Sequence, residues 1–240
     1  MIVSLDIDAQ KTFTPLCPAE LPVHEGHLIA AELNAQARLA QLRVMSKDAH
    51  SPAARWICTN HAEQLRDTGL PNARETWVAH AIVGTQGFEL LDELPPVTAY
   101  DFCVWKGVEP DMHPYGACYH DLAEKLSTGL IEWLRDKGAT VLLVGGLATD
   151  YCVKTTVLQL LRGGDWQVLV NRAACRGIAA DTVAAAWHEM QAAGAVVLFI
   201  VLLAAAQRRN PPSVEMTWPV TQDASSVRSQ QMSRAGSCGR

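Results

Sequence analysis

The stretch 144–164, VGGLATDYCVKTTVLQLLRGG, decides the fold because it runs from a buried strand through two glycines into a helix. The residues just before it complete a short apolar run, 141–144, which is typical of a strand inside a parallel sheet. Thr149 and Asp150 are favourable N-cap residues, and apolar residues then recur at helical spacing as far as the pair Gly163-Gly164. Cys152 is therefore predicted at the first helical turn, where backbone N–H groups and the helix dipole favour a thiolate and lower the thiol pKa.

The rest of the chain alternates between strand and helix patterns. Strands are expected at 2–7, 42–45, 100–105, 141–144, 167–170 and 196–200, and helices at 27–39, 122–137, 152–162 and 181–193. This alternation predicts an α/β fold, with a mostly parallel sheet between helices on both faces in three layers.

Composition limits the classes of partner. The 240 residues carry a net charge of −5, which gives no reason to expect nucleic acid. The longest apolar stretch, 192–206, is shorter than the roughly 20 residues that span a bilayer, so no membrane partner is expected. After it the chain turns polar, and we predict one domain over 1–206 followed by a poorly ordered tail at 207–240.

The cysteines favour a reducing compartment. There are seven of them, an odd number, and none forms a CxxC pair. The first residues, MIVSLD, include an acid where a secretion signal would be apolar. We therefore expect a cytoplasmic protein with free thiols.

Reactive side chains follow four of the predicted strands. Asp8 ends the first strand, Asp48 and His50 follow the second, Lys106 ends the third and Cys152 comes after the fourth. Because ligands bind beyond the carboxyl ends of parallel strands, these residues are expected to share one pocket.

A thiol, a carboxylate and a lysine suit acyl transfer through a thioester. Cys152 would be the nucleophile, Asp8 would take and return its proton, and Lys106 would hold both groups in their charged forms. The glycines at 145–146 would let the backbone approach the substrate, so that N–H groups near Ala148 and Cys152 face the developing oxyanion.

The Asp48-x-His50 pair offers two ligands for one ion. A third ligand is needed, which His61 or His80 could supply, and Glu63 is a candidate for a fourth. Mixed carboxylate and imidazole ligands suit zinc, manganese or iron better than calcium.

Five segments resemble one family of enzymes. They are 5–13 (LDIDAQKTF), 46–52 (SKDAHSP), 76–90 (TWVAHAIVGTQGFEL), 105–117 (WKGVEPDMHPYGA) and 144–164. In this order they resemble the isochorismatase-like cysteine hydrolases, and within them the nicotinamidase/pyrazinamidase branch. The resemblance covers residues 1 to about 195.

The resemblance implies roles for individual residues. It implies a catalytic triad of Asp8, Lys106 and Cys152, and an oxyanion hole made by the N–H groups of Ala148 and Cys152 after a cis peptide bond. It also implies the metal ligands Asp48, His50 and His80, which selects His80 over His61, and substrate-binding rings at Phe13 and Trp77. The implied reaction converts nicotinamide and water to nicotinate and ammonia, accepts pyrazinamide and serves recycling towards NAD. The family is often oligomeric, so a homo-oligomer stays an open expectation.

Some positions depart from the family pattern, and other functions stay open. Lys11-Thr12 stands where Asn-Asp is common, and Ala81, Gln86 and Phe88 replace Cys, Pro and Ala. A related hydrolase acting on isochorismate or an N-carbamoyl compound is one alternative, and a binding protein with an idle pocket is another. Redox sensing by Cys152 would need a resolving thiol, for which Cys118 and Cys175 are candidates.

Overall fold

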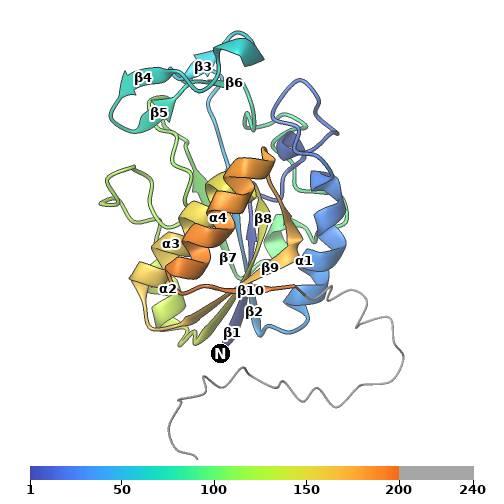
Figure 1. Ribbon diagram of the computed structural model, residues 1–240. Helices are drawn as coiled ribbons and strands as arrows, with labels where there is room; N and C mark the ends of the chain where they lie inside the picture. The colour runs from blue at the N-terminus through green and yellow to red at the C-terminus, as the bar shows by residue number, and fades with distance from the viewer. Residues whose placement is uncertain (200–240) are drawn as a thin grey trace, which may run out of the picture. The chain divides into compact units, whose positions relative to one another are not determined.

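A computed structural model describes residues 1–199, and the predicted tail at 207–240 lies outside the described residues. The central sheet has six strands in the order β10-β9-β8-β1-β2-β7. Every neighbouring pair in it is parallel (Figure 1). The strands are β1 (Ile2–Ile7), β2 (Leu42–Asp48), β7 (Phe102–Lys106), β8 (Val141–Leu147), β9 (Gln167–Arg176) and β10 (Val196–Leu198).

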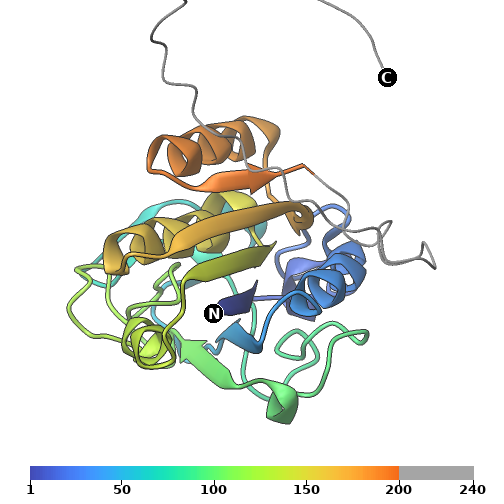
Figure 2. The same cartoon turned by 90° about the horizontal axis from the view of Figure 1, so that it is seen from below.

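Helices cover both faces of this sheet, which confirms the predicted fold class (Figure 2). One core cluster joins apolar residues of the strands to Leu134 in α2 (Leu130–Asp136), Val157 in α3 (Lys154–Gly163) and Met190 in α4 (Ala180–Ala192). A second cluster, on the other face, packs Leu33 of α1 (Ala30–Ala37) against Leu147 and Leu91. None of the described helices is long and apolar enough to cross a membrane.

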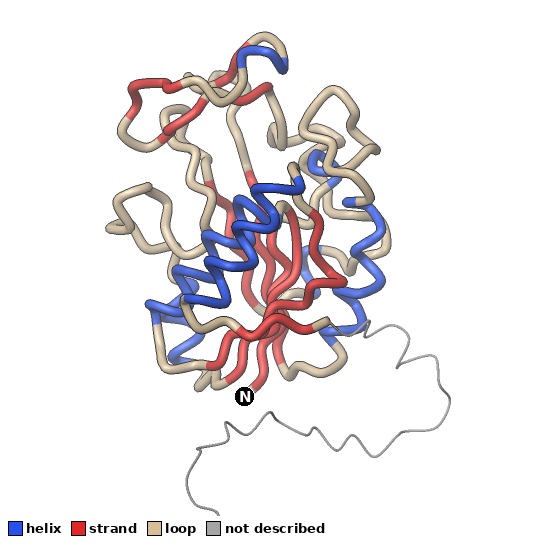
Figure 3. The backbone as a smooth tube through the Cα atoms, viewed as in Figure 1, coloured by secondary structure: helices blue, strands red, loops and turns tan. Residues whose placement is uncertain are grey.

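Two pairs of short strands lie beyond the carboxyl ends of the main strands, as the red segments at the top of Figure 3 show. β3 (Ile57–Cys58) pairs with β6 (Trp77–Val78), and β4 (Asp67–Leu70) pairs with β5 (Ala73–Glu75). They were not expected, because strands of two to four residues have too few positions for alternation to show. They close over the sheet edge where the reactive residues were predicted.

Other differences from the expected elements have local causes. The helix expected at 122–137 begins only at Leu130, after Gly129 at a φ of 85°. The strand expected at 42–45 continues to Asp48, because the polar residues Ser46 and Lys47 pair with β7.

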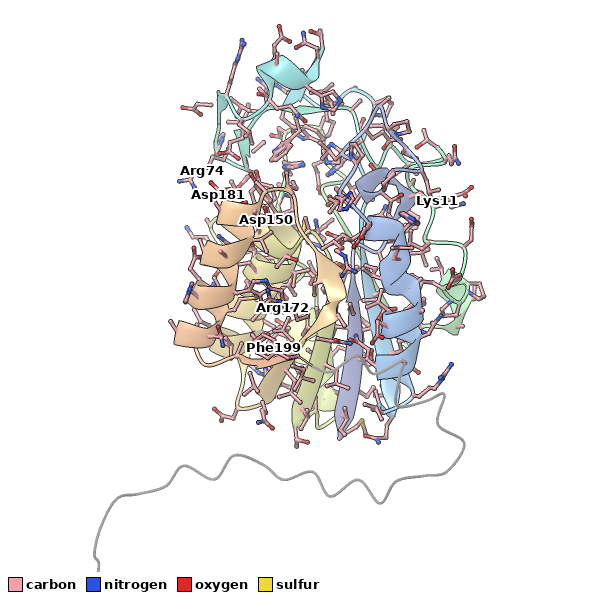
Figure 4. The ribbon with its side chains drawn as sticks, turned by 45° about the vertical axis from the view of Figure 1, so that its right-hand side comes forward. Lys11, Arg74, Asp150, Arg172, Asp181 and Phe199 are labelled. Atoms are coloured by element: carbon pink, nitrogen blue, oxygen red, sulfur yellow. The ribbon has the colours of Figure 1, made fainter. Side chains whose placement is uncertain are left out.

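The Asp150 side chain connects the segment after β8 to the start of α4 (Figure 4). Its carboxylate accepts hydrogen bonds from the backbone N–H groups of Ile178 and Ala179 and, at 2.6 Å, from the Thr182 hydroxyl. Asp150 therefore anchors the start of α4 rather than capping α3, whose N-cap is Val153. Residues 149–153 form a turn of π-helix between β8 and α3.

Candidate active site

The residues at the ends of four strands meet around one ammonium group. The Lys106 Nζ lies 3.0 Å from Asp8 Oδ2 and 3.7 Å from Cys152 Sγ, and it also forms an ion pair with Asp48. A further hydrogen bond goes to the Pro114 carbonyl at 3.2 Å. The four side chains are buried, as the shared sheet edge predicted.

Two polar side chains fix the carboxylates in this cluster. Ser46 Oγ donates to Asp8 Oδ1 at 2.6 Å and accepts from the Asp8 N–H at 3.2 Å, so the other carboxylate oxygen faces Lys106. The Gln10 side chain bonds both the N–H and the C=O of Asp48, at 2.8 and 2.9 Å. The loop after β1 is thereby joined to the end of β2.

The expectation of a low thiol pKa at Cys152 was wrong. Burial, with the Asp8 and Asp48 carboxylates, raises the pKa of the Cys152 thiol well above its usual value, although Lys106 opposes this shift. Cys152 lies in the π-helical turn with its side chain in the cluster, where the desolvation of a thiolate outweighs the helix dipole. The resting thiol therefore keeps its proton.

The charges around the thiol are arranged to remove that proton. Burial raises the pKa of Asp8 above its usual range, while Lys106 lowers it and limits the shift. Burial opposes charge on Lys106 as well, yet the Asp48 and Asp8 carboxylates raise the pKa of Lys106 well above normal. Asp8 also shares a hydrogen bond with the thiol, so the proton acceptor is a carboxylate of raised basicity beside a fixed cation.

Three buried histidines lie next to this cluster. One ligand atom each from His50, His80 and His113 lies within 4.8 Å of the others. The His80 Nδ1 bonds to the Val78 carbonyl at 2.7 Å and the His50 Nδ1 to the Gly107 carbonyl at 3.0 Å. In both rings the Nδ1 therefore carries the proton, and the Nε2 presents a lone pair.

This arrangement fits a divalent metal ion. Among the described residues the buried His50 Nε2 has no hydrogen-bond partner, and it lies 3.5 Å from Asp48 Oδ2. Burial, together with His50, lowers the pKa of His80 to about 3, so its ring is neutral as a metal ligand must be. Nitrogen and carboxylate donors of this kind suit zinc, manganese or iron.

The structure brings together the predicted ligands Asp48, His50 and His80 and excludes others. His61 is exposed, and the Glu63 carboxylate accepts from the Thr59 N–H and hydroxyl on the surface. His113, which the sequence analysis did not select, joins the histidines instead. Its signal was the one histidine of the segment 105–117, seven residues after Lys106.

An aromatic pocket connects the thiol to the histidines. Its lining includes the two predicted rings, Phe13 and Trp77, together with Cys152 and His80. The cavity volume is only about 20 Å³, below the usual range of small-molecule sites. Sequence reasoning missed its other ring residues, which are Tyr115 and Tyr151.

The two glycines of β8 lie where the chain packs closely on itself. A Cβ on Gly146, at a φ of 143°, would lie 2.0 Å from the Ile7 carbonyl oxygen, and one on Gly145 would lie 2.8 Å from Leu33 Cδ2. These glycines therefore allow β8 to pack against β1 and α1. The Leu147–Ala148 peptide bond is cis, as the resemblance implied.

Comparisons with known proteins agree with this geometry. Residues 4–199 match the isochorismatase domain. A nicotinamidase of Acinetobacter baylyi is 30% identical over 193 residues, which cover 78% of this chain and 87% of that one. A nicotinamidase of Escherichia coli is 40% identical over 129 residues, but this match covers 53% of this chain and only 58% of that protein.

Solved structures show the same fold. A structure of "Acinetobacter baumanii nicotinamidase pyrazinamidease" superposes with a TM-score of 0.71 at 27% identity, covering 82% of this chain and 95% of that chain. A Pyrococcus horikoshii pyrazinamidase in complex with zinc gives a TM-score of 0.65, also at 27% identity, covering 82% and 98%. The chain therefore belongs to the isochorismatase-like hydrolase family, within the group that the nicotinamidases and pyrazinamidases form.

Proposed function

We propose that this protein is a nicotinamidase, which hydrolyses nicotinamide to nicotinate and ammonia through a thioester on Cys152. The observation that carries the proposal is one pocket whose lining combines the Cys152 thiol, buried imidazoles and aromatic rings. A flat pyridine carboxamide has the matching chemistry, with an electrophilic carbonyl on one side of the ring and a basic nitrogen on the other. The relatives named nicotinamidase support the same reaction.

Acylation begins with a neutral thiol. As the Cys152 sulfur attacks the amide carbonyl, an S–C bond forms and the thiol proton passes to Asp8. Lys106, 3.7 Å from the sulfur and 3.0 Å from Asp8, stabilises the negative charge during this transfer. Asp8 then gives the proton to the departing nitrogen, the C–N bond breaks and ammonia leaves.

Deacylation uses the same carboxylate in reverse. Asp8 accepts a proton from a water molecule, whose oxygen attacks the thioester carbonyl. The C–S bond breaks, nicotinate is released and the proton returns to the sulfur. In both steps the N–H groups of Ala148 and Cys152 are the proposed donors to the oxyanion, each worth about 3–4 kcal/mol in other enzymes.

Asp48, His50 and His80 would hold the metal ion, for which zinc is the first choice and manganese or iron are alternatives. When bound, the ion would supply a coordination position for the pyridine nitrogen. The zinc in the Pyrococcus horikoshii structure supports the choice of metal class. Phe13 and Trp77 would flank the substrate ring, and the pocket would accept pyrazinamide, which has the same shape.

The test is ammonia release from nicotinamide, pyrazinamide and benzamide by the purified protein. Benzamide has the same ring size and amide group but no ring nitrogen. We expect rapid hydrolysis of the first two substrates and at least a hundredfold lower kcat/KM for benzamide. No release from nicotinamide by folded, metal-loaded protein would overturn the assignment, and equal rates with benzamide would overturn the role of the ring nitrogen.

The proposed biological setting follows from the reaction. Nicotinate is a precursor of pyridine nucleotides, so the enzyme would act in recycling nicotinamide towards NAD in the cytoplasm. The expected partner is the small amide itself, without nucleic acid or membrane.

A further inference from the structure

We propose that His113 is an additional ligand of the metal ion, so that the protein supplies three imidazoles as well as the Asp48 carboxylate. This inference extends the metal site and rests on the proposed function, and it concerns a residue to which the resemblance assigns no role. It rests on the position, spacing and unpaired atoms of the histidine rings.

The loop after β7 holds His113 in place from both sides. The His113 N–H donates to the Asn72 carbonyl at 2.7 Å, and the next carbonyl, that of Pro114, accepts from Lys106 at 3.2 Å. The ring itself packs on the fully buried Trp56 at a centroid distance of 4.3 Å. This loop is therefore tied to the catalytic lysine and to the small strands above the sheet.

The spacing between the ring nitrogens matches ligands of one ion. The His113 Nε2 lies 3.3 Å from the His80 Nε2. Two nitrogens that bind one tetrahedral zinc, each at about 2.0–2.1 Å, are separated by about 3.3 Å. The His50 ring belongs to the same group, since its centroid lies 4.8 Å from that of His80 and 4.9 Å from that of His113.

A hydrogen bond between His113 and His80 is the competing explanation, and it leaves more polar atoms unpaired. Since the His80 Nδ1 donates to the Val78 carbonyl, the His80 Nε2 would have to accept a hydrogen bond from the His113 Nε2–H. The His50 Nε2 would then still lack a partner, as would the His113 Nδ1, among the described residues. A cation shared by the three Nε2 atoms gives the His50 Nε2 a partner, whereas the His113 Nδ1 lacks one among the described residues under either explanation.

The set of ligands has a consequence for the coordination number. With His50, His80, His113 and Asp48 around it, an ion already has four protein ligands, and the pyridine nitrogen would be a fifth. Asp48 also forms an ion pair with Lys106, so its carboxylate links the ion to the catalytic lysine.

The experiment measures metal affinity and does not depend on turnover. Zinc binding to metal-free protein is measured by competition with a chromophoric chelator, for the wild type, His113→Asn and His113→Ala. His61→Ala, which removes an exposed histidine from the same region, is the matched control. We expect both His113 variants to lose at least a hundredfold in affinity, and His61→Ala to bind as tightly as the wild type.

A second measurement separates ligation from the competing hydrogen bond. If His113 is a ligand, its substitution reduces the increase in melting temperature on adding zinc and weakens the visible absorption of the cobalt-loaded protein. If it only bonds to His80, the metal-free variant loses stability, but the zinc-dependent increase and the cobalt spectrum stay unchanged. Affinity within tenfold of the wild type in both folded variants would overturn the proposal.

These outcomes are independent of the proposed activity. A wild type that binds zinc through His113 but does not hydrolyse nicotinamide would leave the ligand assignment intact and reject the function. Nicotinamide hydrolysis that survives in a His113 variant with unchanged zinc affinity would reject the ligand assignment and leave the function intact.

Discussion

At the residue scale, the reactivity of Cys152 depends on its neighbours and not on its position near a helix. Since burial raises the pKa of the thiol, the nucleophile forms only as Asp8 accepts the proton beside Lys106. Cys152→Ala removes the nucleophile and is expected to lower kcat for nicotinamide by roughly 10⁴-fold or more. Cys103→Ala, at an exposed cysteine, is the control and should leave kcat unchanged in the same ammonia assay.

Asp6 is a separate buried carboxylate whose effect depends on pH. Burial raises its pKa from 3.8 to about 6, although Arg43, 2.7 Å away, and the Tyr100 hydroxyl oppose the shift. The folded state therefore holds the Asp6 proton more tightly than the unfolded state. The stability that this proton contributes is complete below pH 4 and is lost as the pH rises through about 6.

Comparison with Asp6→Asn isolates this effect. The unfolding free energy of the wild type, relative to the variant, should fall by about 2 kcal/mol between pH 4 and 7, as measured by urea denaturation. A constant difference across this range would contradict the assignment. Hydrolytic activity is a second readout that reports on the site itself, because Asp6 lies outside the site, two residues before Asp8.

At the element scale, β8 needs glycine at 146. A Cβ there would lie 2.0 Å from the Ile7 carbonyl oxygen, at a φ of 143° that L-residues rarely adopt. Gly146→Ala should therefore destabilise the fold by about 3 kcal/mol or more. Gly138, with a φ of 64° and no atom within 4 Å of its Cβ position, is the control, and its substitution by Ala should cost about 1 kcal/mol. Similar losses for both variants, measured by urea denaturation, would mean that backbone conformation alone matters.

Some elements of the fold can be predicted from the sequence better than others. Apolar runs revealed the strands, because burial in a parallel sheet selects Val and Leu over whole segments. Apolar residues at helical spacing revealed the helices α3 and α4. Polar strand ends, such as Ser46 and Lys47, carry no such pattern, although Ser46 fixes Asp8 in the site. The alternation of strands and helices brought Asp8, Asp48, Lys106 and Cys152 to one edge, and the structure places them together.

His113 could not be found in this way, since a loop histidine has no periodicity and its neighbours come from distant segments. The thiol pKa was mispredicted for a related reason. Helix position can be deduced from sequence, but the desolvation that dominates the pKa depends on how the whole pocket packs.

At the scale of the whole molecule, the single domain expected over 1–206 stays a prediction. The proposed catalytic and metal-binding residues all lie within residues 1–199, the part of the chain that the structure describes. A chain ending at Gln207 should keep the melting temperature of the full chain within about 2 °C and the same kcat/KM for nicotinamide. A large fall in either quantity would show that residues 208–240 contribute to the domain.

The central claim is a thioester between Cys152 and the acyl group of nicotinamide. The most direct measurement is the intact mass of the protein, quenched in acid within milliseconds of mixing with excess nicotinamide. The account predicts a species heavier by one nicotinoyl group, located on the peptide that contains Cys152 and absent from Cys152→Ala. Ammonia release without this species in the samples quenched during the first turnover, or release that persists in Cys152→Ala, would contradict it.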